Sequence, residues 1–125
     1  MNNSFYPNRR GNLMDLTEKS CVPCRGGIPA MTKEQAEKMT SQTLGWELYE
    51  NAKKIRQTYE TTDFVQALKL VELIAELAET EGHHPDITFG WGYCTVVFYT
   101  HKIGGLHEND FIMAAKVNNL AKKIQ

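Results

Sequence analysis

The strongest pattern in the chain is a long amphipathic segment that begins after Asp63 and ends before Gly82. Asp63 can cap a first helical turn, and Gly82 can adopt the left-handed conformation that ends a helix at little cost. Between them, apolar residues recur at helical spacing in two adjacent stripes: Phe64, Ala67, Leu68, Val71, Ile74, Ala75 and Ala78, and then Leu70, Leu73 and Leu77. Because so wide an apolar face needs cover on two sides, we predict a helix over 63–81 that packs on a sheet and on a partner subunit.

Two stretches on either side of this helix have the pattern of β-hairpins. Residues 46–49 alternate apolar and polar side chains, residues 54–59 form a second, weaker strand candidate, and Asn51-Ala52 can form the turn between them. Residues 87–99 contain two further strands, rich in β-branched and aromatic side chains, with a turn at Gly90-Trp91-Gly92.

Two further helices complete the pattern. Thr32 and Gln35 fit a capping box that opens a short helix over 33–40. A last helix over 108–124 follows the Gly104-Gly105 break and carries acidic residues in its first turn. The order helix, two strands, helix, two strands, helix predicts an α+β fold, with a four-stranded antiparallel sheet and helices on one face.

Length and charge limit the kinds of partner. A chain of 125 residues suits one domain, and a net charge of −1 gives no global field that would attract nucleic acid or anionic lipid. No apolar run approaches the roughly 18–20 residues of a membrane helix. We therefore expect no nucleic acid or membrane partner. The N-terminus has no apolar stretch typical of a secretory signal, and three cysteines do not make a disulfide framework, so we expect a cytoplasmic protein.

The first 30 residues differ from the rest because they hold three of the four prolines and show no helical or strand period. We predict a partly ordered tail over 1–28, a domain over 29–125, and that residues 1–25 are dispensable for catalysis. Cys21 and Cys24 have the spacing of a redox or zinc motif. Only Cys94 remains as a further thiol ligand, and no strand precedes the pair, so a non-catalytic tail element is the favoured interpretation.

Three histidines fall at the ends of predicted elements. His83 and His84 precede Pro85 after the long helix, and His101 ends the second hairpin. Side chains at element ends converge on clefts, and imidazole can act as acid and base near neutral pH. A purely structural pair is one alternative, and a metal site is another. The spacing supplies no complete ligand set, so we expect no metal. His107, before the last helix, is more typical of a cap or surface residue.

These residues form a spaced pattern that resembles the pterin-4a-carbinolamine dehydratase family over roughly residues 30–122. The matching positions are Glu79, His83, His84, Pro85, Thr100, His101, Gly105, Leu106 and Asp110. Trp46, whose residue type fits either core packing or stacking on a flat ring, matches a tryptophan of the family's first strand. Three positions depart from the animal members: Ile103 replaces Cys, His107 replaces Ser and Asn109 replaces Arg.

The resemblance implies a dehydration that needs no cofactor. A 4a-hydroxytetrahydropterin, left by an aromatic amino acid hydroxylase, would lose water to give the quinonoid dihydropterin in tetrahydrobiopterin recycling. By this resemblance the catalytic residues are His83, His84 and His101: the first and last as acid and base, and His84 to bind and orient the pterin. Asp110 would fix the tautomer of His101, and Glu79 would hold a ring N–H or a histidine. The other expected substrate-binding residues are Pro85, Thr100 and Trp46.

A binding module is the alternative function. Animal relatives also act as dimerisation cofactors of a homeodomain transcription factor through helix contacts. The wide apolar face of the 63–81 helix would serve such docking, or a homodimer or homotetramer. Physical assistance to an aromatic amino acid hydroxylase is a third possibility.

Overall fold

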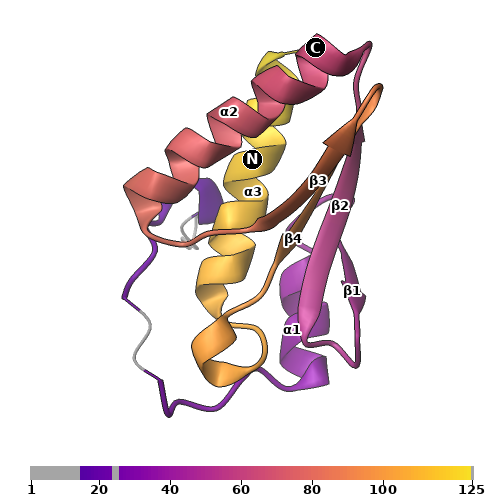
Figure 1. The fold of residues 1–125 in the computed structure, drawn as a ribbon. Helices are drawn as coiled ribbons and strands as arrows, with labels where there is room; N and C mark the ends of the chain where they lie inside the picture. The colour runs from indigo at the N-terminus through magenta and orange to yellow at the C-terminus, as the bar shows by residue number, and fades with distance from the viewer. Residues whose placement is uncertain (1–14, 24–25, 125) are drawn as a thin grey trace.

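A computed structural model describes residues 15–23 and 26–124 of the chain (Figure 1). Residues 1–14, which belong to the predicted tail, and Cys24 of the predicted cysteine pair lie outside the described residues. The described elements are η2 (Leu16–Glu18), α1 (Lys33–Thr40), β1 (Glu47–Tyr49), β2 (Lys54–Glu60), α2 (Phe64–Glu81), β3 (Asp86–Gly90), β4 (Tyr93–Phe98), η3 (His101–Ile103) and α3 (Glu108–Lys123). In this part of the chain no helix is both long and apolar enough to span a membrane.

The four strands form one antiparallel sheet in the order β1-β2-β4-β3. The two predicted hairpins are β1–β2 and β3–β4, and pairing of β2 with β4 joins them, so the predicted α+β fold is confirmed. Successive side chains of a strand point to opposite faces. On β4, Cys94, Val96 and Phe98 are therefore buried beneath the helices, whereas Thr95 and Val97 are only half-buried on the other face.

The helices begin and end where local chemistry predicts. Thr32 Oγ1 accepts the Gln35 N–H at 3.1 Å and the Gln35 side chain accepts the Thr32 N–H at 2.9 Å, which completes the capping box of α1. At α2, the Asp63 carboxylate accepts the Gln66 N–H at 2.8 Å. Gly82 ends α2 with φ 68°, a conformation that costs glycine little.

The predicted apolar stripes of α2 separate into a covered and an uncovered part. Ala67, Leu70, Ile74 and Ala78 are buried in the core. Phe64 and Val65 stay 47% and 72% exposed, and Leu68 is also exposed. The domain itself therefore leaves one edge of this helix without cover.

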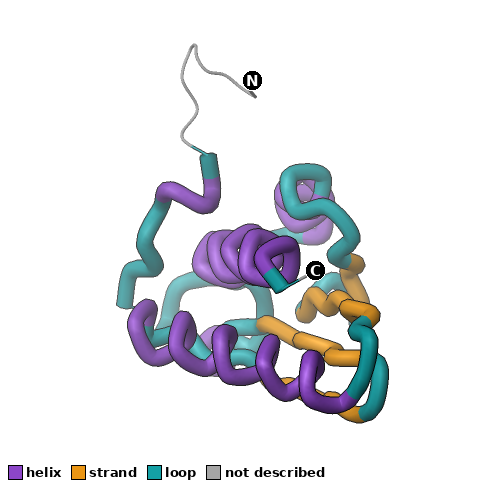
Figure 2. The backbone as a smooth tube through the Cα atoms, turned by 90° about the horizontal axis from the view of Figure 1, so that it is seen from above, coloured by secondary structure: helices purple, strands orange, loops and turns teal. Residues whose placement is uncertain are grey.

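The most buried helix is α3, which lies between α2 and α1 (Figure 2). The strands lie along one side of α3, and residues 15–23 run along the opposite side (Figure 2). Leu16 of this segment is 5% exposed and belongs to the core cluster. Part of the predicted tail therefore packs on the domain.

One boundary differs from the prediction in a way that matters for the site. The sequence predicts His101 at the end of the second hairpin, but β4 ends at Phe98 and His101 begins the short helical turn η3. The Thr100 N–H donates to the Gly105 carbonyl at 2.8 Å and closes this loop, and Gly104 adopts φ 62°. The loop therefore carries His101 away from the sheet.

Candidate active site

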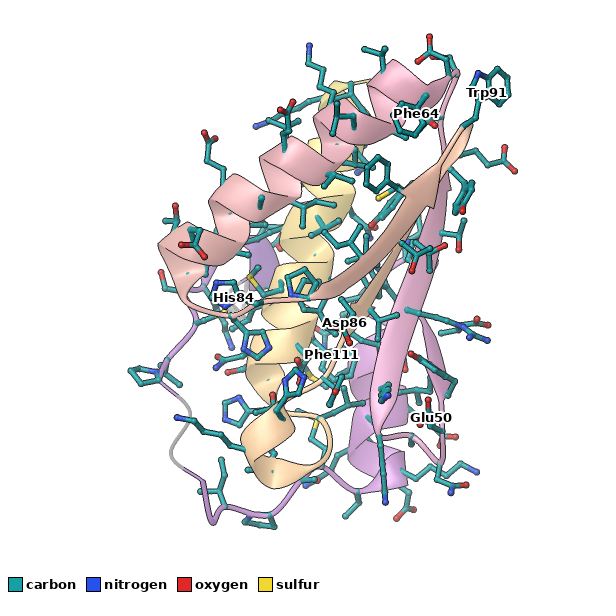
Figure 3. The ribbon with its side chains drawn as sticks, in the orientation of Figure 1. Glu50, Phe64, His84, Asp86, Trp91 and Phe111 are labelled. Atoms are coloured by element: carbon teal, nitrogen blue, oxygen red, sulfur yellow. The ribbon has the colours of Figure 1, made fainter. Side chains whose placement is uncertain are left out.

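A pocket opens where the end of α2, the η3 loop, the start of α3 and residues 22–23 meet. Its volume of about 360 Å³ lies within the range of small-molecule sites. His84 lies on the connection between α2 and β3 (Figure 3). The lining residues are Val22, Pro23, Gly82, His83, His84, Tyr99, Thr100, His101, Lys102 and Asn109.

Asp110 joins three segments at the base of this site. Its side chain is completely buried in the first turn of α3. Oδ2 accepts the Thr100 hydroxyl at 2.8 Å and the His107 N–H at 3.0 Å. Oδ1 lies 2.6 Å from His83 Nε2. A carboxylate near a helix N-terminus is favoured by the helix dipole, which explains an acidic residue at this position.

These contacts fix the orientation and the tautomer of His83. An ionised carboxylate has no proton to donate, so the imidazole Nε2 carries the proton shared with Asp110. Nδ1 of the neutral ring then has a lone pair available. The ring also stacks on Phe98, with centroids 6.0 Å apart and planes at 12°. With 11% of its side chain exposed and with contacts to Asp110 and Phe98, His83 is held in one orientation at the pocket.

His84 has a different partner and a different environment. Its Nε2 lies 2.5 Å from Glu79 Oε2, but the two side chains are 60% and 78% exposed. Such a solvated pair contributes little to stability. The contact with Glu79 sets the orientation of the His84 imidazole, which lines the pocket. The expectation that Glu79 holds a histidine agrees with this contact.

His101 stands on the exposed η3 turn, and its ring centroid is 4.1 Å from that of Tyr99. The family resemblance implies that Asp110 fixes the tautomer of His101, but the structure pairs Asp110 with His83 instead. The physical reason is the η3 loop, which places Thr100 rather than His101 against the carboxylate.

Thr100 acts inside the protein rather than towards the pocket opening. Its hydroxyl donates to Asp110, and its backbone N–H and carbonyl pair with Gly105 and Ile103. These contacts leave Thr100 as a support for the carboxylate. Pro85 follows His84 on the same connection but is absent from the pocket lining.

Trp46 is an expected site residue that lies in the core and does not line the pocket. Its side chain is 6% exposed, and its indole N–H donates to Asn118 Oδ1 at 3.1 Å. Its ring lies 5.7 Å from Phe98, on which His83 stacks. Trp46 therefore touches the site through Phe98, and its substrate-binding role stays a prediction without a direct contact to support it.

Six lining residues were not among the sequence-based site candidates: Val22, Pro23, Gly82, Tyr99, Lys102 and Asn109. Tyr99 and Lys102 flank Thr100 and His101, so their position in the sequence could have suggested them. Val22 and Pro23 had no such signal, because their place in the pocket depends on how the N-terminal segment packs.

Cys21 lies beside the site as a protonated thiol. Burial raises its pKa to about 12, and the nearby Glu81 carboxylate adds to the effect. A thiol with so high a pKa is a poor nucleophile and a poor metal ligand. Within residues 15–23 and 26–124, no three His, Cys, Asp or Glu side chains are grouped to hold a metal ion.

The fold and the pocket define a small α+β protein with a histidine site suited to proton transfer. The family model for pterin 4 alpha carbinolamine dehydratase matches residues 29–120. The chain belongs to the pterin-4-alpha-carbinolamine dehydratase family, an enzyme family whose name states its reaction. Relatives that carry the family's name include one from Methylococcus capsulatus, 57% identical over 85% of this chain and 93% of its own, and one from Azoarcus sp., 50% identical over 87% and 93%.

Solved structures agree on the fold. A transcriptional coactivator/pterin dehydratase from Brucella melitensis matches with a TM-score of 0.70 and 26% identity, over 74% of this chain and 98% of its own. A pterin dehydratase-like protein described as a RuBisCO assembly factor matches with a TM-score of 0.54 and 23% identity, over 62% and 89%. At that identity the second likeness concerns the fold alone.

Proposed function

We propose that this protein dehydrates 4a-hydroxytetrahydropterin to quinonoid dihydropterin and water. The observation that carries the proposal is the convergence of three imidazoles, His83, His84 and His101, on one pocket in a chain of this family. In this proposal the reaction serves tetrahydrobiopterin recycling after an aromatic amino acid hydroxylase in the cytoplasm, as the resemblance implies.

The reaction needs one base and one acid. The N5–H proton passes to the base, and its electron pair forms the C4a=N5 double bond. The C4a–O bond breaks, and the hydroxyl group leaves as water with a proton from the acid. Two imidazoles on separate segments can exchange these roles near neutral pH.

His83 and His101 are the proposed acid and base. His83 is held by Asp110 and Phe98, which leaves Nδ1 for the substrate. His101 stands on the η3 loop at the same pocket. If the two rings serve opposite faces of the pterin, each acts on one 4a epimer. His84, oriented by Glu79, binds the pterin at the pocket mouth.

A binding function is the second candidate, and it rests on an exposed apolar patch. Phe64, Val65 and Leu68 of α2 are exposed, and Trp91 and Tyr93 of the adjacent hairpin are 72% and 39% exposed. Phe64 and Trp91 lie at the same end of the molecule (Figure 3). Contiguous exposed apolar surface marks interaction sites. We propose that this patch forms a homodimer or homotetramer, and docking of another protein there is the alternative.

The test of the enzymatic function is direct. Purified protein is added to freshly prepared 4a-hydroxytetrahydropterin, and the ultraviolet absorbance is followed. The expected result is a decay faster than in buffer and proportional to protein concentration. Decay at the buffer rate would refute the dehydratase function and favour the binding module.

Two variants refine this test. His84→Ala should raise KM more than it lowers kcat, because the proposed role of His84 is binding. His107→Asn is the matched control: it removes an imidazole outside the pocket lining but keeps a residue suited to cap α3. It should keep the wild-type rate.

A further inference from the structure

Residues 15–23, here called the N-terminal strap, are fixed along α3 by side chains of the domain. Leu16 is buried in the core, and Lys19 Nζ donates to Glu108 Oε2 at 2.8 Å. The Cys21 N–H donates to Glu81 Oε1 at 2.8 Å, and Lys116 neutralises the other oxygen of the same carboxylate at 2.8 Å. The strap is thus anchored to both α2 and α3.

The anchor nearest the pocket is Asn109. Its side chain, 2% exposed, pairs with Val22 in both directions. The Val22 N–H donates to Asn109 Oδ1 at 3.1 Å, and Asn109 Nδ2 donates to the Val22 carbonyl at 2.7 Å. Two opposed hydrogen bonds fix both the position and the rotation of the Val22 peptide groups, since each donor must face its own acceptor.

The held segment presents apolar surface to the pocket. Val22 lines the pocket with His83, His84 and His101, yet the residue is 57% exposed. Pro23 is also exposed and lines the same pocket. The buried amide of Asn109 thus fixes a backbone segment whose valine and proline stay uncovered beside the histidines. A flat, partly apolar ring bound beside the imidazoles would cover this surface.

We propose that Val22 and Pro23 form an apolar wall of the substrate site against which the pterin lies, and that Asn109 is the positioning residue that holds this wall. The inference rests on the proposed function, because it takes the pterin as the molecule in the pocket. It argues against the sequence-based expectation that residues 1–25 are dispensable for catalysis.

Binding and turnover of full-length variants test the wall. Binding is measured with a dihydropterin that lacks the 4a-hydroxyl group and therefore does not react. Val22→Ala/Pro23→Ala should weaken this binding and raise KM by about three- to tenfold, with kcat changed less than twofold, since the lost contact is apolar and partly open to water. Ile28→Ala is the matched control, because Ile28 is 40% exposed but does not line the pocket.

Asn109 is tested by a cycle of variants. Asn109→Ala should raise KM by a similar factor, and adding Val22→Ala/Pro23→Ala to it should raise KM little further, because residues that act as a unit are not additive. A purely structural role for Asn109 predicts lower stability with unchanged KM, and fully additive effects would contradict its action through Val22.

The wild-type protein gives a readout that needs no variant. The methyl resonances of Val22 should shift when the dihydropterin is added. Unshifted Val22 methyls in a protein whose histidine resonances do shift would overturn the wall, as would unchanged binding and KM in the Val22/Pro23 variant. A wild-type protein that neither binds the dihydropterin nor dehydrates the substrate would overturn the proposed function and the wall with it, before any variant is made.

Discussion

Asp110→Asn isolates what the buried carboxylate does for His83. The amide can keep its oxygen at the position that accepts the Thr100 hydroxyl and the His107 N–H. Its NH₂ group then faces His83 Nε2, which must change from donor to acceptor. The proton of the neutral imidazole moves to Nδ1, so Nδ1 no longer has a lone pair for the substrate.

The structure also sets the size of the effect on stability. Three hydrogen bonds to a fully buried carboxylate become hydrogen bonds to a neutral amide. Bonds to charged groups contribute about 1 kcal/mol more each than neutral ones, so the free energy of unfolding should fall by about 2–3 kcal/mol. The fold should persist, because donors and acceptors can still be matched.

Two assays measure these changes. Urea unfolding gives the stability, and nitrogen chemical shifts of the imidazoles report the tautomer of His83. Asp110→Asn should also reduce dehydration about as much as His83→Gln. The control is Glu108→Gln, which removes a charge from the same helical turn at a partly exposed side chain. If His83 of the Asp110→Asn protein kept its proton on Nε2, or dehydration ran at the wild-type rate, the assigned role of Asp110 would be refuted.

Three further predictions concern stability and assembly. Gly82→Ala should lower the free energy of unfolding by about 1 kcal/mol, because Gly82 has a φ of 68° and the added Cβ would meet nothing within 4 Å, so the whole cost is that of the left-handed backbone. An unchanged free energy of unfolding would contradict this. Lys116 and the Cys21 N–H lower the pKa of Glu81 from its ordinary value of 4.5. This carboxylate therefore stabilises the fold above pH 4.5 and loses its contribution as the pH falls through the lowered pKa. The difference in the free energy of unfolding between wild type and Glu81→Gln, measured in urea, should shrink over this acid range, and a constant difference would contradict the assignment. Light scattering at micromolar concentration should give the mass of a dimer or tetramer, and a mass near 14 kDa would exclude assembly through the patch.

The fold followed from local signals. The capping box of α1, the Asp63 cap and the Gly82 terminus of α2 are local, so their side-chain chemistry alone placed these boundaries. The hairpins followed from alternation and from their turn residues, Asn51-Ala52 in the first and Gly90-Trp91-Gly92 in the second. Contacts between distant segments could not be derived in this way. Asp110 lies 27 residues from His83, and only the η3 loop decides which histidine it meets.

The packing of the N-terminal strap is a second feature that the sequence alone does not predict. Its anchors, Glu81 and Asn109, lie 60 and 87 residues from Cys21 and Val22, and no periodicity connects them. A repeating pattern reveals the faces of helices and strands, so residues without one are predicted to form a tail. A single peptide group held by a buried amide leaves no such pattern.

The central claim is that the histidine pocket dehydrates the pterin, and the most direct measurement is the rate of a His83→Gln/His101→Gln double variant on a mixture of 4a epimers. General acid–base groups contribute about 10²–10⁴-fold, and the loss here should lie towards or below the lower end because the carbinolamine also dehydrates unaided. Each single variant should keep part of its activity, and the double variant should lose far more than either. A correctly folded double variant that dehydrated both epimers at the wild-type rate would contradict the account.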